Sequence, residues 1–344
     1  MQSIGISSLF EPVPVLTSRG ALIIWNGSPF RLVLVSKKRA HGEITKVSDT
    51  GGSEYKEVAM AQLGNHHLVY GTAWKKDSTH SLVSQAIRKG FRFIDTACQP
   101  KHYNEVGVGE GWTEAVEDLG LQRSDLHLQT KFTPMSGQDP NNIPYDITAS
   151  LEDQVRQSVH ASLENLQTTY LDSLVLHTPL PTHEKTMEVW RVFESFVDEG
   201  VVKALGISNC YKLKFFSRLH HEARIKPTTL QNRFHAKTGF DSDLRRFCDD
   251  KGVLYQPFWT LTANREALAT KGVKEMARKK GLTPQTLMYA FLMTLGYAPL
   301  SGTTSLDHME EDAALMRRFE GGKQVFTDER ELSKMADALG VAEL

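Results

Sequence analysis

Short apolar runs rich in β-branched residues alternate with longer amphipathic stretches from residue 67 to the end of the chain. This alternation is the pattern of repeated strand–helix units that build a parallel sheet. In the stretches between the runs, as in residues 80–89, apolar residues recur with helical spacing. Eight runs occur, and we predict strands at residues 67–74, 91–97, 126–132, 170–177, 202–208, 228–234, 253–258 and 298–302.

Eight parallel strands with intervening helices predict an α/β protein of the (β/α)8 TIM barrel type, because closing the sheet removes both unpaired edges. Gly90, Gly200 and Gly252 each follow a helical stretch, where a residue at positive φ commonly ends a helix. We expect residues 65–344 to form one barrel domain. Residues 1–64 have neither helical nor alternating periodicity and carry a basic patch at 37–39, so we expect an N-terminal extension to which the sequence assigns no role.

Composition and charge disfavour several classes of protein. The chain has 40 Lys and Arg against 41 Asp and Glu, a net charge of -1, which offers no strong field for nucleic acid or an anionic membrane surface. The apolar stretches near residues 21–25 and 32–35 are separated by polar residues and are too short to span a membrane. Three cysteines without CxxC spacing are typical of a reducing compartment, so a cytoplasmic protein without a metal cluster is expected.

Ionisable residues end three successive predicted strands, at Asp95, Lys131 and His177, and Tyr103 follows in the loop after the first of these. The carboxyl ends of barrel strands surround the active site in enzymes of this fold. Taken singly, such residues are often helix caps, surface charges or structural histidines. Their convergence on one end of the barrel favours a catalytic role for the set.

The motifs around these residues resemble those of the aldo-keto reductases. They are Gly-Phe-Arg-Phe-Ile-Asp-Thr-Ala at 90–97, Tyr-Asn-Glu at 103–105, Thr-Lys-Phe at 130–132 and Leu-His-Thr-Pro at 176–179. The resemblance implies NAD(P)H-dependent reduction of an aldehyde or ketone, with Tyr103 as proton donor. Lys131 would then lower the pKa of Tyr103, Asp95 would hold Lys131, and His177 would orient the substrate carbonyl.

Tyr103 departs from the family pattern, in which the tyrosine follows the aspartate by five residues. That position holds Pro100, whereas Tyr103 lies eight residues after Asp95. An insertion at 99–102 that loops out would return the phenol to the site, and His102 is the competing donor. The displacement also leaves open a second function, that of a catalytically weak nicotinamide-binding barrel serving as a redox-sensing or interaction subunit.

The resemblance also implies a cofactor site. In the family, Gly71 and Thr72 would lie near the nicotinamide ribose, Ser208, Asn209 and Gln231 would bind the carboxamide, and Tyr255 would stack on the ring. The Lys and Arg that meet the adenosine phosphate are replaced here, which leaves a set without a fixed cation: Gly302, Thr303, Thr304, His308 and Asp312, with Ser305 beside them. The helix that begins near Leu306 would add partial positive charge. We expect NADPH as cofactor, with NADH a serious competitor.

Substrate selection is expected to rest on short loops. Phe132, Trp259 and the loop at 135–147 would line a modest apolar pocket for small or extended aldehydes and ketones, although such aromatic residues equally often serve packing. A different barrel enzyme would require a Gly-rich phosphate loop or a metal cluster at the strand ends, and neither is found. The sequence indicates no oligomeric state.

Overall fold

The computed structural model describes residues 15–16, 22–23 and 68–341. The chain divides into two compact units, residues 1–49 and 50–344. In the first unit, strands β1 (Val15–Leu16) and β2 (Leu22–Ile23) pair in antiparallel fashion. The rest of the expected extension at 1–64, including the basic patch at 37–39, lies outside the described residues.

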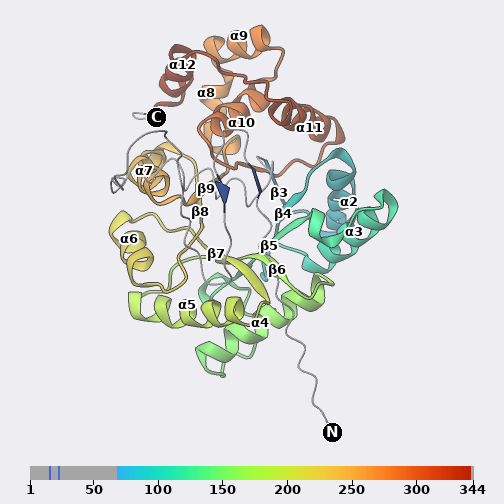
Figure 1. Ribbon diagram of the computed structural model, residues 1–344, viewed down its shortest axis with the longest axis vertical. Helices are drawn as coiled ribbons and strands as arrows, with labels where there is room; N and C mark the ends of the chain where they lie inside the picture. The colour runs from blue at the N-terminus through green and yellow to red at the C-terminus, as the bar shows by residue number, and fades with distance from the viewer. Residues whose placement is uncertain (1–14, 17–21, 24–67, 342–344) are drawn as a thin grey trace. The chain divides into compact units, whose positions relative to one another are not determined.

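The second unit confirms the predicted (β/α)8 barrel (Figure 1). Its eight parallel strands lie in the order β10-β3-β4-β5-β6-β7-β8-β9, and a backbone hydrogen bond of 3.0 Å from Ala298 N to Tyr255 O links the two ends of the sheet. The strands are β3 (Val69–Gly71), β4 (Phe93–Asp95), β5 (His127–Phe132), β6 (Leu171–Leu176), β7 (Val202–Ser208), β8 (Thr229–Arg233), β9 (Leu254–Phe258) and β10 (Leu300–Ser301).

Helices surround the strands (Figure 1). They are α2 (Thr79–Lys89), α3 (Glu105–Leu119), α4 (Leu151–Asn165), α5 (His183–Asp198), α6 (Leu213–Glu222), α7 (Ser242–Lys251), α8 (Arg265–Ala269), α9 (Lys271–Lys280), α10 (Pro284–Thr294), α11 (Leu306–Glu320) and α12 (Glu329–Leu339). Gly90, Gly200 and Gly252 have φ of 112°, 74° and 65°, as expected for residues that end helices. No described helix has the length and apolar character needed to cross a membrane.

The interior of the barrel changes from apolar to polar toward the carboxyl ends of its strands. Side chains alternate along a strand, so every second residue points inward. Near the amino ends, a separate buried cluster fills the barrel, made of Val69, Phe93, Leu254 and Ala298. The next inward position on β4 is Asp95, and on β9 it is Gln256. The fold therefore places its inward polar side chains at the end of the barrel where the sequence predicts chemistry.

The start of α3 holds the loop that carries Tyr103. Asn104 is the N-cap residue, and its side chain accepts a 3.0 Å hydrogen bond from Gly107 N. Gly109 faces α4 so closely that a Cβ there would collide with the carbonyl oxygen of Asn165. Because only glycine permits this approach, α3 is fixed against α4, and the chain enters the helix directly after Tyr103.

Candidate active site

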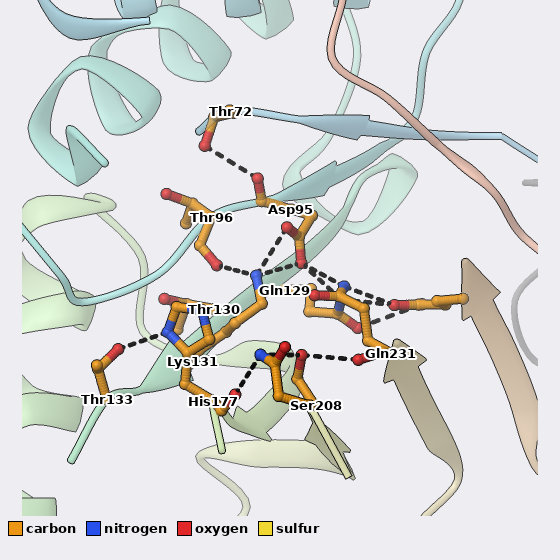
Figure 2. Close-up of polar contacts among 12 residues, drawn as sticks. Thr72, Asp95, Thr96, Gln129, Thr130, Lys131, Thr133, His177, Ser208 and Gln231 are labelled. Atoms are coloured by element: carbon orange, nitrogen blue, oxygen red, sulfur yellow. Dashed lines mark hydrogen bonds and ion pairs between the residues drawn. The ribbon is translucent and has the colours of Figure 1, made fainter. Parts of the chain in front are cut away.

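A buried ion pair lies at the centre of the site. Lys131 Nζ is 2.7 Å from each carboxylate oxygen of Asp95 and 2.7 Å from the carbonyl oxygen of Thr96 (Figure 2). Lys131 is 1% exposed and Asp95 is 2% exposed. Burial lowers the pKa of Lys131, whereas the charge of Asp95 acts in the opposite direction. Three acceptors around three ammonium protons leave Lys131 in a single position.

Three glutamine side chains form a layer around the carboxylate of Asp95. The amide nitrogens of Gln129 and Gln231 donate to Asp95 Oδ1 at 2.7 and 3.0 Å. Both nitrogens also donate to Gln256 Oε1, at 2.8 and 3.0 Å. Sequence reasoning missed Gln129 and Gln256. Because side chains alternate along a strand, Gln129 could have been found from its place two residues before Lys131. Gln256 pairs with Gln231 across β8 and β9 and so lies on the same inward face. The layer satisfies the carboxylate without adding charge.

The inserted residues before Tyr103 form a turn. Backbone nitrogens of His102 and Tyr103 donate to the carbonyl oxygen of Gln99 at 3.1 and 3.0 Å, and Pro100 is exposed. The turn places the Tyr103 ring 5.3 Å from Lys131 Nζ and 5.9 Å from the His177 ring, which it meets edge-on. The expected looped insertion is therefore present, and it returns the phenol to the other three residues.

His102, the competing donor, takes a different direction. Its ring stacks on Trp74 with centroids 3.7 Å apart. Its carbonyl oxygen accepts a 2.7 Å hydrogen bond from Trp74 N. The imidazole Nδ1 is buried without a hydrogen-bond partner. Geometry therefore favours Tyr103 over His102 as the residue that joins Lys131 and His177.

The expected effect of Lys131 on Tyr103 is not present in this structure. Burial of the phenol raises the pKa of Tyr103 above its ordinary value, and the negative charge of Asp95 raises it further. Asp95 lies 2.7 Å from the ammonium group of Lys131 and offsets part of its field at the neutral phenol, so burial sets the direction of the shift. Tyr103 thus holds its proton through the neutral pH range, the form that a proton donor requires.

His177 is a neutral side chain with a fixed ring. Its Nδ1 lies 2.6 Å from the hydroxyl oxygen of Thr133 (Figure 2). Burial lowers the pKa of His177 to about 3, and the charges of Lys131 and His102 act in the same direction. Thr133 was not predicted, but it lies two residues after Lys131 and so on the same face of the chain. A neutral ring held at one nitrogen can donate or accept a hydrogen bond through the other.

The predicted carboxamide-binding residues lie together beside His177. Ser208 Oγ donates to the carbonyl oxygen of Gln231 at 2.7 Å, and Asn209 Nδ2 donates to the carbonyl oxygen of His177 at 2.9 Å. Thr72, the residue after β3, donates through its hydroxyl to the carbonyl oxygen of Asp95 at 2.9 Å. Gly71 precedes it as the last residue of β3. These residues therefore lie together at the carboxyl ends of the strands, and their binding of a primary amide stays a prediction.

Tyr255 does not face the mouth of the barrel. Its ring is 1% exposed and packs edge-on against Tyr297, with centroids 5.3 Å apart. Its hydroxyl donates to Asp241 at 3.0 Å. Because Gln256 points inward, its neighbour Tyr255 must point toward the helices, and the inward aromatic residue on β9 is Phe258. The expected stacking of Tyr255 on nicotinamide is contradicted by this arrangement.

The segment predicted to bind the adenosine phosphate is exposed at its start, Gly302, and buried at its end, Asp312. Asp312 is 3% exposed and accepts a 2.7 Å hydrogen bond from Ser301 Oγ, so its carboxylate is occupied inside the wall. Burial raises the pKa of Asp312 to about 7. The N-cap of α11 is Ser305, which accepts from His308 N, and the hydroxyl oxygen of Thr303 accepts from Ser305 N. Gly302, Thr304 and His308 are exposed, whereas Thr303 and Ser305 are half-buried.

Sequence reasoning also missed a lysine at this corner. Lys75 Nζ donates to the carbonyl oxygen of Gly302 at 2.9 Å and lies 4.9 Å from the centre of the Tyr70 ring. Lys75 is 4% exposed, and burial lowers its pKa to about 8. The Lys-Lys pair at 75–76, separated from Thr72 by two residues in the loop after β3, was the available signal, but only the fold brings the first and last barrel strands together.

The two aromatic residues expected to line a substrate pocket have different surroundings. Phe132 is 1% exposed and packs against Tyr145 in the core between strands and helices. Phe132 therefore serves packing, the alternative that the sequence left open. Trp259 is 48% exposed at the end of β9. Met135 and Ile147, in the long loop, are also largely exposed.

Metal and disulfide chemistry find no support within residues 68–341. No group of three or more His, Cys, Asp or Glu side chains there could hold a metal ion. Cys98, Cys210 and Cys248 are buried, and none of them forms a disulfide bond. The described part of the chain is thus a barrel in which a Lys–Asp pair, a tyrosine, a histidine and several amide side chains meet at the carboxyl ends of the strands, an arrangement suited to an oxidoreductase.

Comparisons with known proteins identify the family. The model of the aldo/keto reductase family matches residues 60–328, and the chain belongs to this family. An uncharacterized oxidoreductase of Bacillus subtilis is 28% identical over 233 residues, 68% of this chain and 76% of that protein. The NAD(P)H-dependent D-xylose reductase of Pachysolen tannophilus is 28% identical over 268 residues, 67% of this chain and 79% of that protein.

A solved structure agrees with this assignment. The aldo/keto reductase from Brucella melitensis superposes with a TM-score of 0.63 at 25% identity, covering 79% of this chain and 94% of that chain. The resemblance seen in the sequence motifs is therefore confirmed at the level of family and fold. The roles of individual residues rest on the geometry described above.

Proposed function

We propose that the protein reduces a small aldehyde or ketone to an alcohol, with a reduced nicotinamide dinucleotide as hydride source. The observation that carries the proposal is the convergence of Lys131, Tyr103 and His177 on one side of the buried Asp95. NADPH is the expected cofactor and NADH the competitor. Cys98, Cys210 and Cys248 form no disulfide bond, which suits a reducing, cytoplasmic setting.

Tyr103, Lys131 and His177 have different roles at the carbonyl oxygen of the substrate. Tyr103 keeps its proton until negative charge develops on that oxygen and then donates it. Lys131, held by Asp95, places positive charge 5.3 Å from the Tyr103 ring and stabilises the phenolate that remains. If Thr133 donates to His177 Nδ1, the other imidazole nitrogen carries a proton and donates to the carbonyl oxygen, which orients the substrate.

The cofactor is expected to lie across the mouth. When bound, it supplies the hydride that the chain itself cannot provide. Ser208, Asn209 and Gln231 would hold its carboxamide, with Gly71 and Thr72 near the ribose. Gly302, Thr303, Thr304 and His308 would meet the adenosine end, and Lys75 adds a cation at that corner.

The test is turnover of reduced cofactor with a panel of small aldehydes and ketones, followed by absorbance. We predict that Tyr103→Phe lowers kcat by several orders of magnitude, because it removes the donated proton, and changes the Kd for NADPH by less than about twofold. His102→Asn is the matched control and should retain turnover. Turnover that survives in Tyr103→Phe but is lost in His102→Asn would transfer the donor role to His102.

A further inference from the structure

Arg233 is a positive residue at the mouth that the catalytic proposal does not use. It is the last residue of β8, two positions after Gln231. Because Gln231 points inward to Asp95, Arg233 shares the inward face of the strand. Its side chain begins roughly 7 Å further toward the mouth than that of Gln231, the rise of two strand residues.

The guanidinium group of Arg233 lies over two aromatic rings. Its central carbon lies 4.1 Å from the centre of the Trp259 ring and 5.9 Å from that of Phe258. Trp259 is about half exposed and has φ of 59°, an uncommon backbone conformation for a residue of this size. Stacking on an exposed indole fixes the plane of the guanidinium and leaves its edge available for hydrogen bonds.

The charge of Arg233 lacks a carboxylate partner within residues 68–341, and its Nε is a buried donor without a hydrogen bond. Asp241 is close enough to affect the same tyrosine, Tyr211, but its carboxylate is occupied elsewhere. It accepts from Asn232 Nδ2 at 2.7 Å and from the Tyr255 hydroxyl at 3.0 Å, on the outward side of the barrel. A fixed guanidinium with an unused donor is suited to an anion.

A short chain of hydrogen bonds links Arg233 to the catalytic residues. Arg233 N donates to the Tyr211 hydroxyl oxygen at 3.2 Å, and that hydroxyl donates to Asn209 Oδ1 at 3.2 Å. Asn209 Nδ2 in turn donates to the carbonyl oxygen of His177 at 2.9 Å. Arg233 therefore lies on the same rim as the amide-binding groups.

We propose that Arg233, stacked on Trp259, binds the oxygen anion of a molecule held at the mouth, a carboxylate or a phosphate. The proposal rests on the proposed function, since the molecule is a participant in carbonyl reduction. Two sources carry this chemistry: an acidic group on the carbonyl substrate, and the diphosphate of the dinucleotide. The first would make acidic aldehydes or ketones the preferred substrates.

The experiment compares Arg233→Gln with Lys237→Gln, which removes an exposed positive charge from the loop after the same strand. Arg233→Lys keeps the charge but loses the planar fork and tests whether charge alone suffices. Each protein is titrated with NADPH by fluorescence. Each is then assayed with benzaldehyde and with a benzaldehyde that carries a ring carboxylate, and thermal melting confirms folding.

A loss of at least about tenfold in NADPH affinity in Arg233→Gln alone assigns the anion to the cofactor diphosphate. A rise of at least about tenfold in KM for the acidic aldehyde, with NADPH affinity and the neutral aldehyde unchanged, assigns it to the substrate. Partial recovery in Arg233→Lys supports either assignment. Changes below about twofold in every measurement, equal to those of Lys237→Gln, overturn the proposal.

The readouts also separate this proposal from the proposed function. If no carbonyl is reduced, Arg233 is tested by the NADPH titration and by calorimetric titration with benzoate against benzamide. An Arg233-dependent preference for an anion would then support the inference although the proposed function had failed. Normal turnover with no effect of Arg233→Gln would overturn the inference alone.

Discussion

Replacing Lys131 with methionine tests the buried ion pair in the centre of the site. At 2.7 Å, and with an effective dielectric constant of about 20, the attraction between Lys131 and Asp95 is about 6 kcal/mol before desolvation is subtracted. Desolvation of each ion costs several kcal/mol, so the net contribution of the pair is small. Lys131→Met leaves Asp95 charged and buried, which should lower the free energy of unfolding by about 3–5 kcal/mol.

A double-mutant cycle separates the structural effect from the catalytic one. Asp95→Asn combined with Lys131→Met removes both charges, so its loss of stability should be smaller than the sum of the two single losses by about 2 kcal/mol or more. Turnover should stay low in all three variants, because Lys131→Met and the double variant lack the cation beside Tyr103, and Asp95→Asn no longer holds that cation in place. Recovery of stability without recovery of kcat is the expected result.

The measurements are urea unfolding followed by circular dichroism, and kcat with saturating cofactor. A Lys131→Met protein within about 1 kcal/mol of the native stability, with kcat within about tenfold, would refute the reasoning.

Three further predictions concern the residues near the expected adenosine end of the cofactor. Gly302→Lys with His308→Arg should shift kcat/KM toward NADPH over NADH by about tenfold or more, and no shift would show that these residues do not face the phosphate. Asp312→Asn should raise the free energy of unfolding above pH 7 by at most about 4 kcal/mol, because the native carboxyl, with its pKa raised to about 7, loses stability as pH rises from about 4 to 7. Urea unfolding across this range should show the gain vanishing at acid pH. Since burial lowers the pKa of Lys75 to about 8, NADPH should bind more weakly by about tenfold between pH 7 and 9.5, and Lys75→Met should flatten that profile in fluorescence titrations.

The strand pattern was sufficient to predict the barrel, since eight β-branched runs with helical stretches between them leave few other topologies. It also predicted that Asp95, Lys131 and His177 lie at the carboxyl ends of three successive strands. Asp95 is the last residue of β4, Lys131 is the last but one of β5, and His177 follows the last residue of β6. The position of Tyr103 required a looped insertion, and the turn at Gln99 supplies it. These features depend on local sequence, which is why the chain alone could indicate them.

The features that could not be predicted depend on which face of a strand points inward. Residues 253–258 carry apolar or aromatic side chains on both faces, so the orientation of Tyr255 follows only from the pairing of Gln256 with Gln231. Lys75 meets Gly302 because the first and last strands of the barrel are neighbours, a contact 227 residues apart in sequence. Arg233 can be placed at the mouth of the barrel only once the inward-pointing residues of β8 are known.

The glutamine layer beneath Asp95 has a consequence for how this site can change. An amide presents a donor and an acceptor of nearly equal size, and exchanging the two requires only a rotation of the side chain. Gln129, Gln231 and Gln256 can therefore reverse their chain of hydrogen bonds when the group above them changes from an acceptor to a donor. Because the glutamine layer can adapt in this way, residues at the mouth can be substituted while the apolar cluster of Val69, Phe93, Leu254 and Ala298 stays unchanged. The chemistry of the site can therefore change without a change in the core of the barrel.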